Sequence, residues 1–134
     1  MELTVVIVDD DPMISLMHRT VIKKGDLSSD IKNFTNGKEA LDFLVSQQEG
    51  YSYLLLLDLN MPVMNGWEFL DELNKLDLGK NVLVAIVSST VDKSSVVRAT
   101  DYPQVVDFLS KPFTKNNLND LIRMNAALQP STIN

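Results

Sequence analysis

The sequence contains no cysteine among its 134 residues, which excludes disulfide bonds, thiolate metal sites and cysteine nucleophiles. Its longest apolar runs, such as Val82 to Val87, are far too short to span a bilayer. The first residues lack a basic segment, and the acids at positions 9–11 interrupt the apolar stretch too early for a signal peptide. We therefore expect a cytoplasmic protein.

Positive charge is also scarce in this chain. Twelve basic residues face 18 acidic ones, so the formal net charge is -6. This balance disfavours non-specific binding to nucleic acid and to anionic membranes. A hydrophobic content of 45% is normal for a globular protein of this length, which is enough for one buried core. We expect a single domain that binds neither nucleic acid nor membrane.

The chain alternates apolar runs with amphipathic segments joined by short connections. The patterns predict strands at residues 4–8, 31–34, 53–57, 82–87 and 105–109, each followed by a helix. Alternating strands and helices predict an α/β fold, a doubly wound parallel sheet of the flavodoxin-like (βα)5 type. The first, third and fourth strands are the most apolar and should be central, which favours the order 2-1-3-4-5.

Polar residues collect where the predicted strands end. Asp9 and Asp10 follow the first strand, Asp58 and Asn60 the third, Ser88 to Thr90 the fourth, and Lys111 the fifth. The carboxyl ends of parallel strands meet at one rim, where open α/β sheets bind their ligands. An acid after one strand is usually only a helix cap, as we expect for Asp11 before Pro12. Four strands that end in complementary chemistry instead favour a ligand site.

The gathered carboxylates indicate a metal site. Three carboxylates close together repel one another at a cost of several kcal/mol, which a hard divalent cation with oxygen ligands offsets. Mg²⁺ suits this site best, because it accepts few carboxylates and keeps several waters. The metal could then carry a phosphoryl group, with Lys111 and Ser88 binding the other phosphoryl oxygens.

Four segments carry a family resemblance: Asp9-Asp10 after a strand, Leu57 to Gly66, Val87-Ser88-Ser89, and Lys111-Pro112-Phe113. Together they resemble the receiver domain of two-component response regulators. The resemblance runs from about Leu3 to Leu128. It implies a receiver domain over residues 1–129 and a C-terminal tail over 130–134. We expect a stand-alone receiver rather than one joined to an output domain.

The resemblance implies roles for the rim residues. Asp58 would be the phospho-acceptor, taking a phosphoryl group from a phosphohistidine of a sensor histidine kinase or histidine phosphotransfer protein. Mg²⁺ would be bound by Asp10, Asp58 and the backbone carbonyl of Asn60, with Asp9 supporting it through water. Lys111, Ser88 and Ser89 would bind the phosphoryl oxygens, and Pro112 should follow a cis peptide bond.

The same resemblance implies a switch. Ser88, where many receivers carry Thr, would turn toward the phosphate, and Phe108 would rotate inward with it. Phe108 lacks the phenolic oxygen of a Tyr, so its ring must signal by shape alone. A downstream protein would bind the face made by the fourth helix, fifth strand and fifth helix. Asn60 and Thr90 stand at positions that tune hydrolysis in the family.

Two other functions stay open from the sequence alone. A Mg²⁺-dependent phosphatase with an Asp nucleophile usually has a second acid two residues later, where this chain has Asn60. A receiver-like binding module that is never phosphorylated is the other alternative. We favour a signalling switch that is no enzyme beyond catalysing its own phosphorylation and dephosphorylation.

Two remaining residues have structural interpretations. The first predicted helix has a face formed by Ile14, Met17, His18 and Val21. We expect His18 to be a packed core histidine rather than a phosphorelay histidine. Trp67, at the start of the third predicted helix, is expected to serve packing or lie at the surface, close enough to report on Asp58 by fluorescence.

Overall fold

The computed structural model describes residues 3–28, 30–47, 51–76 and 81–129. The five strands are β1 (Leu3–Val8), β2 (Asp30–Phe34), β3 (Ser52–Leu57), β4 (Asn81–Ser88) and β5 (Val105–Ser110). They form one parallel sheet in the order β2-β1-β3-β4-β5, which confirms the predicted order and both predicted edges.

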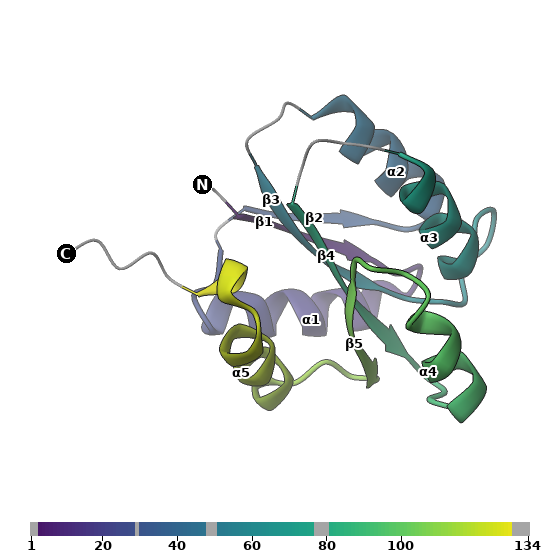
Figure 1. Ribbon diagram of the computed structural model, residues 1–134. Helices are drawn as coiled ribbons and strands as arrows, with labels where there is room; N and C mark the ends of the chain where they lie inside the picture. Colours follow the sequence, from purple (N-terminus) through teal and green to yellow (C-terminus); the bar gives the residue numbers. More distant parts are fainter. Residues whose placement is uncertain (1–2, 29, 48–50, 77–80, 130–134) are drawn as a thin grey trace.

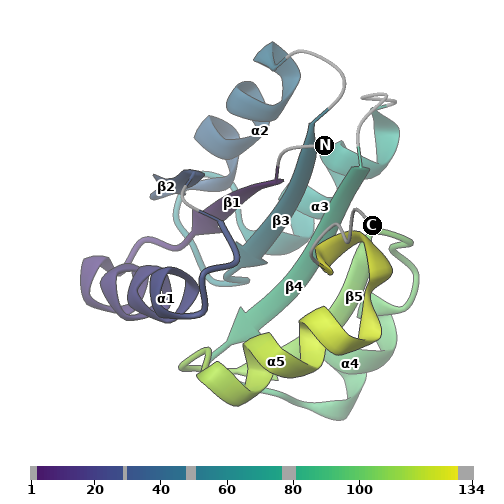
Figure 2. The same ribbon diagram turned by 90° about the vertical axis from the view of Figure 1, so that its left-hand side faces the viewer.

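Helices lie on both faces of this sheet (Figures 1 and 2). They are α1 (Pro12–Lys24), α2 (Gly37–Ser46), α3 (Gly66–Lys75), α4 (Lys93–Ala99) and α5 (Lys115–Met124), with a short 3-10 helix η1 (Ala126–Leu128) after α5. α1 and α5 cover one face, and α2, α3 and α4 cover the other (Figure 1). None of the helices in the described part of the chain is long and apolar enough to cross a membrane.

Strand periodicity divides the interior into two cores. Successive side chains of a strand point to opposite faces of the sheet. Val6, Val8, Leu55 and Leu57 accordingly join the core under α2 and α3, whereas their neighbours in β1 and β3 join the core under α1 and α5. Every residue of β3 is buried, because helices cover the sheet on both sides. This central strand therefore holds the residue that follows it, Asp58, in a fixed place.

The N-terminus of α1 is capped as the sequence predicts. Asp11 Oδ1 accepts the backbone N–H of Met13 at 2.9 Å, and Pro12 occupies the first helical position. The prediction that Met17 lies on the buried face of this helix with His18 was wrong, because Met17 is 42% exposed. The buried residues are Ser15, His18 and Ile22, spaced three and four apart along one face of the helix. This confirms His18 as a packed core residue. The predicted tail over 130–134 lies outside the described residues.

Candidate functional site

The main chain fixes the residues that follow the strands. The N–H of Asp58 donates to the carbonyl of Val8 at 2.9 Å, so the pairing of β1 with β3 continues one residue beyond β3. Likewise, the N–H of Lys111 donates to the carbonyl of Ser88 at 2.8 Å. The residues that follow β3 and β5 are therefore positioned by sheet hydrogen bonds rather than by free loops.

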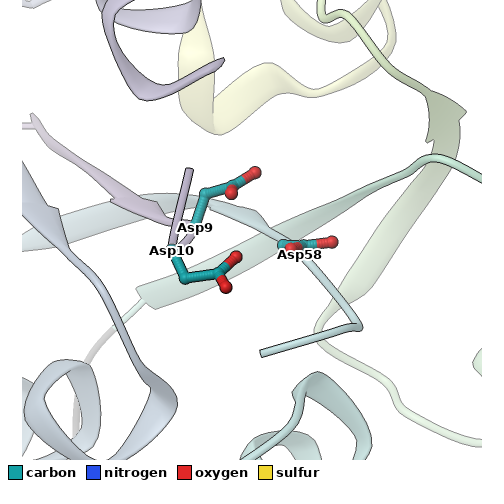
Figure 3. A group of neighbouring side chains, drawn as sticks. All are labelled: Asp9, Asp10 and Asp58. Atoms are coloured by element: carbon teal, nitrogen blue, oxygen red, sulfur yellow. The ribbon is translucent and has the colours of Figure 1, made fainter. Parts of the chain in front are cut away.

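Three aspartates gather at this rim (Figure 3). One carboxylate oxygen from each of Asp9, Asp10 and Asp58 lies within 4.8 Å of the other two. Asp9 and Asp58 are each only 3% exposed, whereas Asp10 is open to solvent. Hard oxygen donors at this separation, open on one side to water, fit a divalent cation such as Mg²⁺. The predicted acidic cluster is thus present in the structure.

Lys111 faces two of these acids. Its Nζ atom lies 2.8 Å from Oδ2 of Asp9 and 3.3 Å from Oδ2 of Asp58. Burial lowers the pKa of Lys111, but the hydrogen bond and charge of Asp9, followed by those of Asp58, outweigh burial and raise the pKa overall. The lysine is therefore a cation at neutral pH. One lysine cannot neutralise three carboxylates, so the cluster keeps a net negative charge that favours a bound cation.

The electrostatics of Asp58 differ from those of an ordinary surface acid. Burial raises the pKa of Asp58, and the negative charge of Asp9 raises it further. Lys111 and the backbone N–H of Asn60, which donates to Asp58 Oδ1 at 3.4 Å, act in the opposite direction without reversing the shift. The charged form of Asp58 is therefore destabilised in the folded protein, and a bound cation would stabilise it.

The loop from Asp58 to α3 is held tightly against β3. The N–H of Gly66 donates to the carbonyl of Leu59 at 2.9 Å. A Cβ atom at Gly66 would lie only 2.6 Å from the carbonyl oxygen of Asp58, so this close approach requires glycine. Within the loop, Val63 has a φ of 70° and is 80% exposed. A β-branched residue in this conformation is strained.

The other predicted site residues lie close to the rim in sequence but differ in exposure. Ser88 is 1% exposed, and its Oγ accepts the N–H of Thr90 at 3.2 Å. Ser89, Thr90 and Asn60 are exposed. Phe108 is partly buried on β5, where it lines a cavity of about 190 Å³ between that strand and α4. The peptide bond between Lys111 and Pro112 is cis, as the resemblance implies.

Sequence reasoning missed two groups of contacts, one beside the rim and one between α3 and the end of α4. His18 Nε2 accepts the buried N–H of Phe113 at 3.0 Å. On α3, the ring of Trp67 lies 4.2 Å below the guanidinium of Arg98 and 6.0 Å from the ring of Tyr102, at the end of α4. Both groups join residues distant in the chain, so hydrophobic periodicity carries no signal of them. The isolated histidine on an apolar helix face was the one visible hint.

A doubly wound parallel sheet with two buried acids and a partly buried lysine at its carboxyl rim defines a class of α/β domains built to bind a cation and an anionic group together. The chain matches the response regulator receiver domain over residues 5–123, and it belongs to that family. The family resemblance predicted from the sequence is thereby confirmed. Receiver domains are signalling switches that interact with histidine kinases or phosphotransfer proteins and with downstream effectors.

Known relatives agree with this assignment. The chain is 34% identical over 116 residues to the cyclic di-GMP phosphodiesterase response regulator RpfG of Xanthomonas campestris, covering 87% of this chain and 30% of that protein. It is 28% identical to a two-component response regulator of Arabidopsis thaliana, over 90% of this chain and 82% of that protein. The chain thus spans under a third of the first relative and most of the second.

A solved structure agrees as well. The response regulator receiver protein of Dyadobacter fermentans superposes with a TM-score of 0.81 and 28% identity, covering 91% of this chain and 96% of that one. The receiver fold therefore extends over nearly the whole chain.

Proposed function

We propose that this receiver accepts a phosphoryl group on Asp58 from a phosphohistidine of a sensor histidine kinase or histidine phosphotransfer protein. The observation that carries the proposal is the surrounding of Asp58. This buried carboxylate lies at the end of the central strand, with Lys111 Nζ at 3.3 Å and the carboxylates of Asp9 and Asp10 beside it. Such an arrangement offers both a nucleophile and charge neutralisation.

The transfer is a displacement at phosphorus. A carboxylate oxygen of Asp58 forms a new bond to phosphorus while the bond from phosphorus to the donor histidine nitrogen breaks. The electron pair of the broken bond stays on the imidazole nitrogen, and the product is an acyl phosphate on Asp58. Phosphoryl transfer asks the protein mainly for alignment and charge neutralisation.

The rim residues supply these two requirements. Lys111 is cationic and placed to pair with phosphoryl oxygens, and the hydroxyls of Ser88, the last residue of β4, and of Ser89, which follows it, are further donors. Mg²⁺ bound by Asp10, Asp58 and the carbonyl of Asn60, with Asp9 acting through water, would neutralise further charge on the phosphoryl oxygens. The three-carboxylate cluster supports this assignment.

The phosphate would bias the partner-binding surface through contacts made in only one state. Ser88 is the candidate switch hydroxyl, because its Oγ accepts the N–H of Thr90 and a hydroxyl that accepts can still donate its proton to the phosphate. The cavity between α4 and β5 leaves space beside Phe108 for its ring to move. We assign the downstream partner to the face of α4, β5 and α5.

The phosphatase alternative finds no support at the site. Its general acid would stand two residues after the nucleophile, where Asn60 cannot donate a titrating proton. We therefore propose a signalling switch that catalyses only its own phosphorylation and dephosphorylation. Its cytoplasmic location stays a prediction.

Intact-mass measurement after incubation with acetyl phosphate and Mg²⁺ tests the proposal. We expect one phosphoryl group to be added to the wild type and to Asp42→Asn, a control that removes an exposed carboxylate from α2. Asp58→Asn should gain none. Continuous consumption of acetyl phosphate with no adduct on the wild type would instead support the phosphatase. An unmodified wild type that consumes no acetyl phosphate would support the binding module that is never phosphorylated.

A further inference from the structure

The chain has a single histidine, and it is almost fully buried. His18 lies on the inner face of α1 with 1% of its surface exposed. Its Nε2 accepts the N–H of Phe113 at 3.0 Å, across 95 positions of sequence. The two rings also meet edge to face, with their centroids 6.0 Å apart. The Nε2 atom of His18 thus binds a residue within the β5–α5 connection.

That partner belongs to the loop that carries Lys111. The N–H of Lys111 donates to Ser88 on β4, and the N–H of Thr114 donates to Asn117 inside α5. Pro112 has no N–H. The Phe113 N–H is therefore the one main-chain donor through which this loop is held on the α1 side. Because Phe113 is 1% exposed, its N–H would be buried without a partner if His18 were absent.

The helix that carries His18 is itself tied to the acidic cluster. α1 begins directly after the acids, with Asp11 as its N-cap. Ser15 Oγ, one turn before His18, reaches the carbonyl of Asp9 at 3.5 Å. Hence α1 connects two sides of the site: its first turn holds Asp9, and its second turn holds the loop of Lys111.

We propose that His18 is a positioning residue for phosphoryl acceptance, whose Nε2 holds the Phe113 N–H so that Lys111 faces Asp9 and Asp58. The inference rests on the proposed function, which it deepens by naming a residue outside the rim. His18 touches neither the phosphoryl group nor the metal, and it acts through the loop.

The protonation state of His18 agrees with this role. An Nε2 atom that accepts a hydrogen bond carries no proton, so the ring is neutral with its proton on Nδ1. Burial lowers the pKa of His18, and the charge of Lys111 lowers it further, while the charge of Asp9 acts in the opposite direction. The neutral form, which alone can accept from Phe113, is therefore the favoured one at neutral pH.

Two substitutions separate the acceptor from the bulk of the side chain. In His18→Leu the volume is largely kept, but the acceptor is lost. In His18→Gln the amide oxygen can take the place of Nε2. Ile22→Val is the matched control, because Ile22 is fully buried on the same face of α1 and is absent from the Phe113 hydrogen bond. All measurements are made at a temperature where each variant is folded by circular dichroism.

The rate of phosphorylation is measured by intact mass over a range of acetyl phosphate concentrations with Mg²⁺. We expect His18→Leu to lower the maximum rate about tenfold, because a small displacement of the aligned Lys111 ammonium group lowers the reaction rate by a factor of this order. His18→Gln should recover most of that rate, and Ile22→Val should match the wild type. The amide proton of Phe113 should move upfield in the nuclear magnetic resonance spectrum of His18→Leu alone.

The failures are distinguishable. If the wild type gains no phosphoryl group, the proposed function is wrong. If the wild type is phosphorylated and His18→Leu is phosphorylated equally fast, the positioning role is overturned while the proposed function stands. Equal losses of rate in His18→Leu, His18→Gln and Ile22→Val would also overturn it, since core packing alone would then account for the effect.

Discussion

Lys111 places its Nζ atom 2.8 Å from Oδ2 of Asp9. This is shorter than the 3.3 Å from Nζ to Oδ2 of Asp58, so the lysine in the unmodified protein is held mainly by Asp9, which follows β1. Asp9 thereby keeps the ammonium group of Lys111 beside Asp58, although the ammonium group lies closer to Asp9 than to Asp58. A phosphoryl group on Asp58 would offer Lys111 a more highly charged partner within reach.

Asp58→Asn should stabilise the metal-free protein at pH 7. The folded pKa of Asp58 is raised, so the folded state binds more protons than the unfolded state between the two pKa values. This carboxyl therefore contributes stability below its unfolded pKa, and the contribution is lost as pH rises through the folded pKa. Asparagine stays neutral throughout. Urea unfolding should show a higher midpoint for Asp58→Asn at pH 7, and the difference should shrink toward pH 4.

Asp42→Asn controls for the loss of one negative charge at an exposed position of α2. An Asp58→Asn variant that is less stable than the wild type at pH 7 would contradict the account of Asp58 as a destabilised acid.

Adding Mg²⁺ should raise the urea midpoint of the wild type more than that of Asp58→Asn, because Asp58→Asn lacks one of the three carboxylates.

Val63→Gly should also stabilise the protein. Valine at a φ of 70° costs about 1–2 kcal/mol, and glycine removes this strain while losing about 0.5–1 kcal/mol through the entropy of the unfolded chain. We expect a net gain of about 0.5–1 kcal/mol in the free energy of unfolding. Val91→Gly, at an exposed position with negative φ, should lose stability instead. Equal losses in both variants would rule out strain at Val63.

The single tryptophan offers a readout of the switch. Trp67 contacts Arg98 and Tyr102 at the end of α4, so a displacement of α4 should change its fluorescence. Phosphorylation of the wild type should shift the emission. Ser88→Ala should accept the phosphoryl group and show little of this shift, whereas Ser46→Ala at the end of α2 should behave as the wild type. A full shift in Ser88→Ala would remove Ser88 from the switch.

Asn60 is predicted to tune the lifetime of the acyl phosphate. Its side chain is exposed beside Asp58, where an amide can hold the attacking water. Asn60→Ala should therefore lengthen the lifetime by about threefold or more, since the water loses its orientation. The decay of the phosphorylated mass measures this directly, with the exposed Asn119→Ala of α5 as control. An unchanged lifetime in Asn60→Ala would refute the role; Thr90 would be the next candidate.

The sequence was sufficient to predict the strand order and the acidic rim, because both follow from local patterns. Apolar runs such as Leu54 to Leu57 indicate strands buried on both faces, and each ends at a polar residue whose place the sheet then fixes. The prediction for α1 placed Met17 on the same face as His18 because it is apolar, but Met17 is exposed. In the structure, Ser15 is buried through its hydrogen bond to Asp9.

What the sequence could not predict are contacts that depend on the three-dimensional meeting of distant segments. The bond between His18 and Phe113 joins α1 to the β5–α5 loop, and no periodicity carries such information. The stack of Trp67, Arg98 and Tyr102 is of the same kind. Side-chain hydrogen bonds and ring contacts are specified only once the packing of both elements is known.

Locating the modified residue tests the central claim most directly. The protein is phosphorylated with acetyl phosphate and Mg²⁺, reduced with borohydride, digested and sequenced by tandem mass spectrometry. Borohydride converts an aspartyl phosphate to homoserine, which marks its position. We predict homoserine in place of Asp58 alone. Homoserine in place of Asp9 or Asp10, with Asp58 intact, would contradict the account.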